Sequence, residues 1–359
     1  LFAAGNPHSS TCSSFRQTIH LTPNPLDVAL DRLGRPLRDL RVSVTDRCNF
    51  RCRYCMPREE FGKGHDFLPK TEILTYEEIR NFVKACKPLG LRKVRITGGE
   101  PLLRQDIHHL VRQLSSMEME VALTTNGSLL ENNAANLAES GLSRVTISLD
   151  AIDQEVHSKI TDSKVPVTDI LDGISAAIRY ELGPVKVNCV VQRGVNEHQI
   201  PKLVRKFRGT GVIVRFIEFM DVGSTNGWTQ GQVVPTSEII DFLSSEFDLT
   251  PLARKSASDV ASRWAHSDGS GEIGFISSVS QPFCGDCVRA RLSSDGKFFT
   301  CLFTTMGHDM SALIRSGRET EGLTQSIEEV WSARKDRYSE ERSSGAISLP
   351  RVEMSYIGG

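Results

Sequence analysis

Six of the nine cysteines stand in two groups of three. Cys48, Cys52 and Cys55 have the spacing Cys-x3-Cys-x2-Cys, and the second group, with the spacing Cys-x2-Cys-x13-Cys, is Cys284, Cys287 and Cys301. A closed structural zinc site needs four ligands, and a cubane iron-sulfur cluster normally takes four cysteines. A triad would leave one iron without a protein ligand and open to a small molecule. The two groups therefore predict metal centres that take part in chemistry.

Zinc is the alternative interpretation of both triads. The second triad would need a recruited histidine, for which His266 and His308 are candidates, and the first triad has no histidine within its loop. Arg47, Arg51 and Arg53 alternate with the cysteines of the first triad, and we expect their charges to favour thiolates. Two incomplete triads in one chain favour iron-sulfur clusters over zinc.

Three cations interrupt strands that are otherwise apolar: Arg95 in Val-Arg-Ile, Lys186 in Val-Lys-Val and Arg215 in Val-Arg-Phe. A buried charge without a partner is costly, so each of them needs an anion. They could point outward, or they could pair with acidic residues such as Glu100, Asp150 and Glu218. Because three strands share the feature, we favour a polyanionic ligand, for which a triphosphate would be suitable.

The elements that position these groups alternate between strand and helix. Short β-branched runs occur at 40–44, 93–97, 121–124, 144–149, 185–191 and 212–219, with helical patterns between them. Thr75 and Glu78 form a capping box before a helix that ends before Gly90, and another helix is expected from Leu129 to Ser140, followed by Gly141. This order predicts an α/β protein with a parallel sheet, whose ligands bind at the carboxyl ends of the strands. The first cysteine triad directly follows the first strand.

The composition and the remaining segments indicate the class of protein and the extent of its folded part. The 359 residues are 39% hydrophobic and 24% charged, with a formal net charge of -1, which predicts a soluble protein without a nucleic-acid or membrane partner. The polar stretch 221–232 reads as a linker before a helix capped by Thr236, and residues 1–33 read as a disordered extension. Cys86 and Cys189 are expected in the core, and Cys12 stands alone; the clustered cysteines indicate a reducing compartment.

Two motifs resemble those of a known family. The Cys-x3-Cys-x2-Cys loop, with Tyr54 before its last cysteine, resembles the signature of the radical S-adenosylmethionine (SAM) enzymes, and the Gly-Gly-Glu-Pro segment 98–101 is similar to their SAM-binding element. Within that superfamily the chain resembles the GTP 3′,8-cyclases of molybdenum cofactor biosynthesis from about Gly34 to Gly359. The motifs that carry this likeness are 34–36, 45–51, 97–101, 124–127, 215–220, the second triad with Arg-Ala-Arg, and the terminal Gly-Gly.

The resemblance implies a partial (β/α)6 barrel over residues 34–230 and a C-terminal auxiliary iron-sulfur domain over 231–359. The two triads would hold two [4Fe-4S] clusters, the first binding SAM and the second binding the guanine of GTP. SAM would contact Tyr54, Gly99, Ser148 and Met220. GTP would contact Arg41, Arg95, Thr124, Lys186, Arg289, Ala290 and Arg291, and the residues expected to act in catalysis are Arg41, Arg289, Arg291, Gly358 and Gly359.

The same resemblance implies the reaction and its partners. Reductive cleavage of SAM would give a 5′-deoxyadenosyl radical that takes hydrogen from ribose C3′. The resulting carbon radical would attack C8 of guanine, and further reduction would complete this lyase reaction. The product, (8S)-3′,8-cyclo-7,8-dihydroguanosine 5′-triphosphate, would pass to cyclic pyranopterin monophosphate synthase. The electron donor is left open, as is the oligomeric state, with a homodimer as one hypothesis. We expect a cytoplasmic protein, or a mitochondrial matrix protein if the source is a eukaryote.

Two other functions fit parts of the pattern. A radical SAM enzyme that modifies peptides would also need an auxiliary cluster, although such domains usually carry more than three cysteines. A non-enzymatic zinc protein would use both triads structurally. Iron analysis separates the zinc protein from the enzymes, and the choice of substrate separates the two enzymes.

Overall fold

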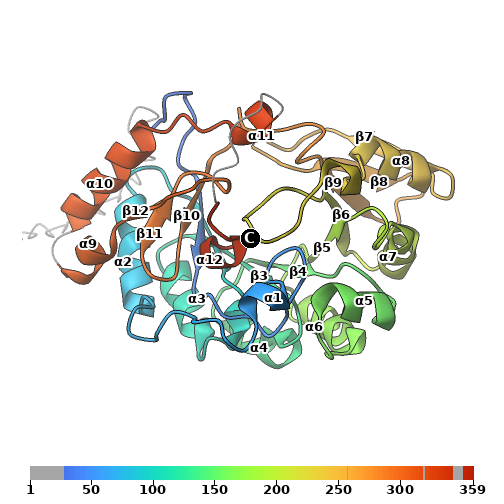
Figure 1. Cartoon of the computed structure of the whole chain (residues 1–359), viewed down its shortest axis with the longest axis horizontal. Helices are drawn as coiled ribbons and strands as arrows, with labels where there is room; N and C mark the ends of the chain where they lie inside the picture. The colour runs from blue at the N-terminus through green and yellow to red at the C-terminus, as the bar shows by residue number, and fades with distance from the viewer. Residues whose placement is uncertain (1–27, 257, 318–319, 343–350) are drawn as a thin grey trace, which may run out of the picture.

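The computed structural model describes residues 28–256, 258–317, 320–342 and 351–359. Its described residues form one 12-stranded sheet with an order that departs from the chain order (Figure 1). The parallel part of the sheet contains, in spatial order, β10 (Arg289–Leu292), β1 (Asp39–Ser43), β2 (Lys93–Thr97), β3 (Glu120–Thr125), β4 (Arg144–Ser148), β5 (Lys186–Val191), β6 (Ile213–Glu218) and β9 (Glu272–Ile276). Antiparallel strands extend one edge with β11 (Lys297–Phe299) and β12 (His308–Asp309), and the other with β8 (Ser262–His266) and β7 (Leu249–Leu252).

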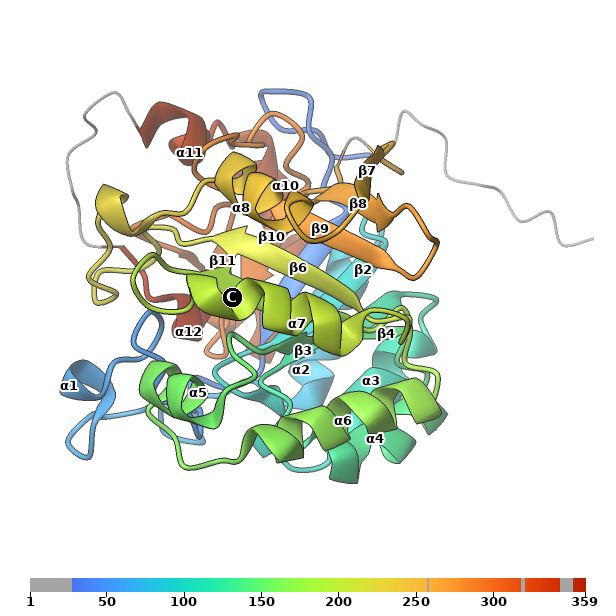
Figure 2. The ribbon, with the colours of Figure 1, turned by 90° about the vertical axis from the view of Figure 1, so that its right-hand side faces the viewer.

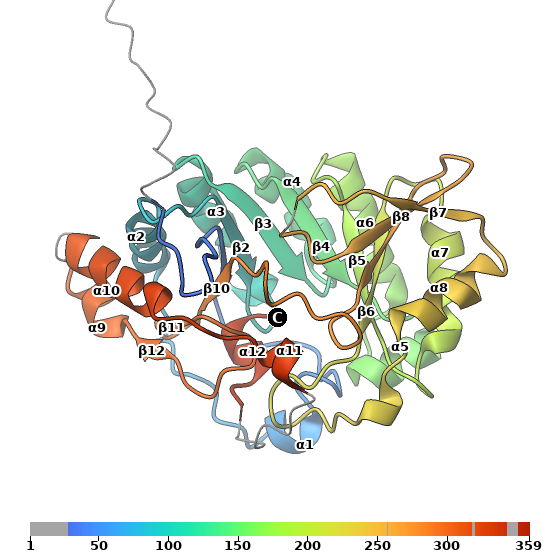
Figure 3. The ribbon, with the colours of Figure 1, turned by 90° about the horizontal axis from the view of Figure 1, so that it is seen from above.

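The parallel strands form an arc with helices on its convex side (Figure 3). These helices are α2 (Tyr76–Cys86), α3 (Ile107–Ser115), α4 (Leu130–Glu139), α6 (Val167–Arg179) and α7 (Ile200–Phe207). Figure 2 shows α4, α6 and α7 side by side over this face. The two helices predicted in the first half of the chain are confirmed: the capping box of Thr75 and Glu78 starts α2, and Gly141, with a φ of +89°, follows α4. The α/β fold class and the partial barrel are therefore as expected.

The remaining helices are short or belong to the C-terminal half. Before β6 there are α1 (Arg58–Phe61), α5 (Gln154–Thr161) and the 3-10 helices Pro101–Leu103 and Glu197–Gln199. After β6 there are a 3-10 helix, Gln230–Gln232, and the helices α8 (Thr236–Ser244), α9 (Ser311–Arg315), α10 (Thr320–Ser332), α11 (Tyr338–Glu341) and α12 (Met354–Ile357). The last of them, α12, lies on the concave side of the sheet (Figures 1 and 3). No helix in the described ranges is both long and apolar enough to span a membrane.

Each parallel strand has two different faces. Side chains such as Val42, Ile96 and Val187 are fully buried under the helices, whereas their neighbours Arg41, Arg95 and Lys186 line a cavity on the concave side. Successive side chains of a strand point to opposite faces, so apolar and cationic residues alternate. The hydrophobic core therefore lies between sheet and helices, and the concave face is left for ligands.

The C-terminal half does not form a sheet of its own, which the sequence did not indicate. Its strand β9 pairs with β6, and its strand β10 pairs with β1, both in parallel. Residues 231–359 thus extend both edges of the six-stranded arc. The division of the chain into two domains near residue 230 remains a proposal.

Two expectations about local structure are wrong. The predicted disordered extension lies largely outside the described residues, as does Cys12, but residues 28–33 are folded: Ala29 and Asp31 are buried, and Leu30 bridges to Pro36. Thr236 does not cap α8, because it is the first helical residue and its hydroxyl accepts a hydrogen bond from Ser277 at 2.8 Å. Cys86 and Cys189 are buried in the core, as predicted.

Candidate active site

All six cysteines of the two triads line one cavity of about 710 Å³ on the concave side of the sheet. Its wall includes residues of the strands from β10 through β9, and Gly359 also reaches it. The cysteines come from loops that follow β1, precede β10 and follow β11. The two triads, which are more than 200 residues apart in the chain, therefore face the same space.

The first cysteine loop is held against the end of β2. The amide of Gly99 donates to the carbonyl of Thr45 and that of Glu100 to the carbonyl of Arg47, each at 2.8 Å. A Cβ on Gly99 would lie 2.3 Å from the Arg47 carbonyl oxygen, so only glycine permits this approach. Around the sulfur of Cys48, the Phe50 amide donates at 3.4 Å and the Asn126 side-chain amide at 3.8 Å. Such N–H donors suit a sulfur bound to a cluster.

Arg51 of this loop holds the backbone around the first triad. Arg51 donates to the carbonyls of Cys48, Phe50 and Phe61 at 2.7 to 2.8 Å. Burial raises the pKa of the Cys48 thiol to about 11, and it raises the pKa of Cys52 and Cys55 as well. The charge of Arg51 lowers the pKa of Cys48, but burial and the neighbouring Glu100 outweigh it, so binding of a metal would have to drive the deprotonation.

In the second triad a hydrogen bond reaches one sulfur from β10. Arg289 donates to the sulfur of Cys287 at 3.3 Å, and the Phe303 amide donates to that of Cys301 at 3.5 Å. Burial raises the pKa of Cys301 to about 11. For Cys287 the effect of burial is outweighed by Arg289 and Arg334, and its pKa falls to about 6. This triad combines buried thiols with a cationic wall.

The zinc interpretation of the second triad depends on a recruited histidine. No group of three Cys, His, Asp or Glu side chains in the described ranges is arranged to hold a metal ion. The proposed zinc ligands also lie elsewhere: His266 packs edge-on against Phe247, and His308 is exposed on β12. Neither histidine lines the cavity.

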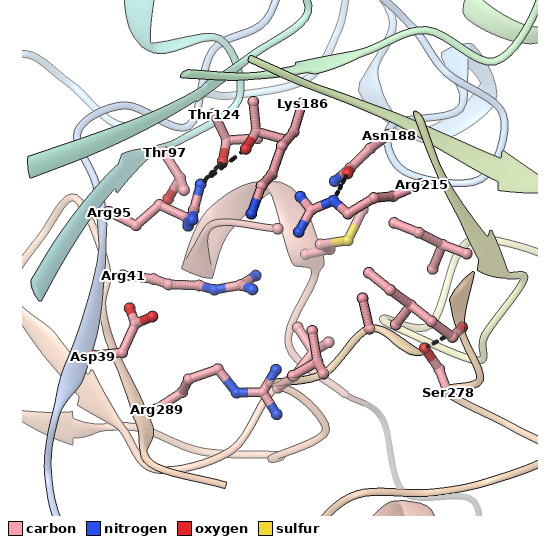
Figure 4. A pocket seen from close by; sticks show the side chains of 18 of the residues that line it. Asp39, Arg41, Arg95, Thr97, Thr124, Lys186, Asn188, Arg215, Ser278 and Arg289 are labelled. Carbon is pink, nitrogen blue, oxygen red and sulfur yellow. Dashed lines mark hydrogen bonds between the residues drawn. The ribbon is translucent and has the colours of Figure 1, made fainter. Parts of the chain in front are cut away.

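Cations gather in the centre of the cavity (Figure 4). Arg95 donates to Thr124 and Thr146 at 3.2 and 3.3 Å, and Arg215 donates to Asn188 at 2.9 Å. The other members of this central cation cluster are Arg41, Lys186, Arg289 and Arg291. Burial, with the surrounding charges, lowers the pKa of Arg41 well below its usual range and that of Arg215 to about 9.

The cations of the strands do not pair with Glu100, Asp150 or Glu218, which the sequence offered as alternative partners. Glu100 accepts from the amide of Asn126 and the hydroxyl of Thr125, both at 2.7 Å. Asp150 accepts from Tyr54 at 2.7 Å and from the Val190 amide at 2.8 Å. Glu218 accepts from the amides of Thr236, Val279 and Ser280, each at 2.8 Å. The charges of Arg95, Lys186 and Arg215 therefore face the cavity without a carboxylate partner among these three, as the ligand interpretation requires.

The residues expected to contact SAM lie in the cavity wall. They are Tyr54, Gly99, Ser148 and Met220. The hydroxyl of Tyr54 is oriented by Asp150, whose pKa burial raises to about 6, although the bonds from Tyr54 and Val190 oppose that rise. The supporting role of Asp150 was not predicted, but its position one residue beyond the predicted strand 144–149 is the signal that could have indicated it.

The segment Arg-Ala-Arg of β10 divides between cavity and core. Arg289 and Arg291 line the cavity, whereas the side chain of Ala290 is fully buried in the hydrophobic core and pairs in register with Leu40. The expectation that Ala290 contacts the nucleotide is therefore wrong for its side chain, because alternation along the strand turns it away.

The C-terminal tail reaches the same cavity. Arg291 donates to the carbonyl oxygens of Gly358 and Ile357, the latter at 3.4 Å. Gly358 has a φ of +75°, and a Cβ there would lie 1.9 Å from the hydroxyl oxygen of Thr97. Gly359 follows directly in the cavity wall. The geometry thus joins a catalytic candidate on β10 to the last two residues of the chain.

Several cavity residues were not predicted from the sequence. Asp39, Thr146 and Asn188 lie on the concave face of β1, β4 and β5, and Arg144 and Arg334 also line the cavity. Asp39 pairs with Lys93 at 3.2 Å, and one of its carboxylate oxygens is buried without a partner. Alternation along the strands could have identified Asp39 and Asn188, each two residues from a predicted cation.

Two family models together match most of the chain. The one described as "Radical SAM superfamily" matches residues 42–207, and the one described as "Molybdenum Cofactor Synthesis C" matches residues 212–340. A GTP 3′,8-cyclase of Acidothermus cellulolyticus is 47% identical over 356 residues, covering 92% of this chain and 98% of that protein. Another, from Staphylococcus epidermidis, is 46% identical over 339 residues, covering 93% and 99%.

Two solved structures have a fold similar to that of this chain. Streptococcus suis SuiB bound to S-adenosylmethionine aligns with a TM-score of 0.57 at 15% identity, covering 86% of this chain and 68% of that chain. The protein anSMEcpe with bound AdoMet and a peptide aligns with a TM-score of 0.52 at 16% identity, covering 89% and 94%. At such low identity these two likenesses concern the fold alone.

Proposed function

The chain belongs to the GTP 3′,8-cyclase family of radical SAM enzymes, and on that premise we propose how its cavity carries out the reaction. The family performs the first step of molybdenum cofactor biosynthesis, which agrees with the model matched by the C-terminal half. As a radical SAM protein it uses SAM and a [4Fe-4S] cluster. We assign the reaction to the lyase class.

We propose that the chain holds two clusters and that both face one molecule of GTP. The observation that carries this proposal is the single cavity, which has a cysteine triad from each half of the chain and the central cation cluster in its wall. A peptide would have little use for six guanidinium and ammonium groups in so confined a space. A triphosphate carries the negative charge that these cations need as a partner.

The proposed roles follow the position of each residue. Cys48, Cys52 and Cys55 hold the first cluster, and SAM binds beside it against Tyr54, Gly99, Ser148 and Met220. Cys284, Cys287 and Cys301 hold the second cluster. GTP binds to Arg41, Arg95, Thr124, Lys186, Arg289 and Arg291, all of which line the cavity.

When bound, the first cluster and SAM would supply the 5′-deoxyadenosyl radical that takes hydrogen from C3′ of GTP. C3′ then joins C8, and the resulting nucleotide radical takes up one electron from the external reductant and one proton to give the 7,8-dihydro product. The protein's own part is to hold C3′ against that radical and to exclude water. The bond from Tyr54 to Asp150 fixes one wall of the SAM site, and Arg291 is fixed by the tail. Arg289 and Arg291 would stabilise negative charge that develops on the nucleotide.

The proposal includes a place in a reaction sequence. The product keeps its triphosphate and would be consumed by a cyclic pyranopterin monophosphate synthase. The electron donor is not assigned, and a homodimer stays a hypothesis.

The reaction is tested with GTP deuterated at C3′. Anaerobic, iron-loaded protein is incubated with SAM, a reductant and the labelled GTP, and 5′-deoxyadenosine is analysed by mass spectrometry. We expect one deuterium in the 5′-deoxyadenosine and formation of the cyclised nucleotide. Unlabelled 5′-deoxyadenosine, or zinc in place of iron in protein purified without oxygen, would refute the proposal.

The affinity for GTP is expected to fall as the pH rises through about 8. Burial, with the charges of Arg215, Arg144 and Arg95, lowers the pKa of Lys186 to about 8. A bound triphosphate favours the ammonium form and raises that pKa, so binding above it must take up a proton. Calorimetry in buffers of different ionisation enthalpy measures this uptake, with Lys186→Met as the control. An equal proton uptake by wild type and Lys186→Met would contradict the assignment.

A further inference from the structure

Two buried arginines from distant parts of the chain contact the loop of the second triad. Arg35 donates to the carbonyl of Cys284 at 2.7 Å, and Arg334 donates to the carbonyl of Cys287 at 2.8 Å. Arg35 precedes β1, whereas Arg334 follows α10. Figure 1 shows these two segments close together, away from the centre of the sheet. Each arginine therefore holds the backbone of one cysteine.

One carboxylate joins the two arginines. Asp31 accepts from Arg35 at 2.6 Å and lies 3.4 Å from Arg334, and the side chain of Asp31 is fully buried. Arg334 also stacks over Trp331 at 4.6 Å, and the indole of Trp331 donates to the Arg35 carbonyl at 3.1 Å. Rotation of either arginine would break several of these contacts at once, so the group is rigid.

The third cysteine is connected to the same group. Asp336 lies 3.5 Å from Arg334 and accepts a 2.6 Å hydrogen bond from Thr300, the residue before Cys301. Its backbone carbonyl also accepts from Arg35 at 2.9 Å. All three cysteines of the second triad are thus tied, directly or through one neighbour, to the same buried charges.

We propose that Asp31, Arg35 and Arg334 form a bracket that positions the second triad for its cluster. This inference rests on the proposed second iron-sulfur cluster. It adds to that site residues that do not belong to the central cation cluster. A cubane needs its cysteines at fixed positions on different irons, and outer hydrogen bonds commonly orient metal ligands. One guanidinium nitrogen of Arg35 is buried without a hydrogen-bond partner among the described residues.

The bracket is tested in two backgrounds of the full chain. One carries Cys48, Cys52 and Cys55 as serine and keeps only the second triad, and the other carries Cys284, Cys287 and Cys301 as serine and keeps only the first. Arg334→Gln is introduced into each, with Lys335→Gln, at the exposed neighbouring position, as the matched control. Iron is counted after anaerobic reconstitution, and the cluster is observed by electron paramagnetic resonance.

We expect Arg334→Gln to reduce iron from about four per chain to nearly none where only the second triad remains, and to leave about four where only the first remains. Lys335→Gln should change neither value. Unchanged iron and an unchanged resonance signal in the first background would refute the bracket, and so would equal losses in both, which would indicate a general role in folding. If the second-triad background binds no iron even with Arg334 intact, the proposed second cluster itself is refuted.

Discussion

Removal of Gly358 and Gly359 is expected to lower kcat on the order of 10²-fold, because displacement of a positioned group by about 1 Å can cost that much. The Gly358 carbonyl accepts a hydrogen bond from the buried guanidinium of Arg291. Without it that guanidinium keeps, among the described residues, only the longer contact, 3.4 Å, with the Ile357 carbonyl and is held less precisely. The anchors of the tail stay in place, since Glu353 holds Ser224 and Arg351 holds Asp221. The melting temperature should therefore change little.

Single alanine substitutions refine this prediction. At Gly358, with its φ of +75°, a Cβ would lie 1.9 Å from the Thr97 hydroxyl oxygen, whereas at Gly359 it would meet the flexible side chain of Met354 at 2.9 Å. Gly358→Ala should approach the loss seen on truncation, and Gly359→Ala should be much milder. Turnover of GTP under single-turnover conditions is the measurement. A truncated chain with kcat close to that of the wild type would exclude an active role for the tail.

Arg41→Gln is expected to weaken GTP binding while making the GTP-free protein more stable. Arg41 is partly buried, its Nε is buried without a partner among the described residues, and it faces Arg291, Arg289 and Arg95. Loss of a charged hydrogen bond costs about 1.5–3 kcal/mol, which corresponds to a roughly 10- to 100-fold weaker affinity. In the absence of GTP the same change removes a buried charge from a repulsive cluster, so the free energy of unfolding should rise.

Calorimetry with GTP and thermal melts with and without GTP check both parts of that prediction. Arg179→Gln, on the exposed side of α6, is the matched control and should leave affinity and melting temperature unchanged. The stabilisation of wild type by saturating GTP should exceed that of Arg41→Gln. If Arg41→Gln binds GTP as tightly as wild type, the central cation cluster is not the nucleotide site.

Local sequence patterns determined the elements and much of the chemistry. Short segments of the sequence encode the strands, the capped helix α2 and the two cysteine triads. This is so because strand and helix periodicity and ligand spacing are local properties. The cations of β2, β5 and β6 could be recognised as anomalous for the same reason. The partners of these cations could not be recognised from the sequence, because a strand pattern does not specify which face of the sheet meets a cavity.

The tertiary structure decided what depends on long-range pairing. Only the parallel pairing of β10 with β1 brings Arg289 and Arg291 beside Asp39 and Arg41. Burial and the neighbouring Glu100 raise the pKa of the Cys48 thiol although the charge of Arg51 lowers it. The contacts of Asp31 with Arg334 and of Arg35 with Asp336 each span some 300 residues. Such contacts arise from the register and packing of the whole sheet, and no local segment of the sequence encodes them.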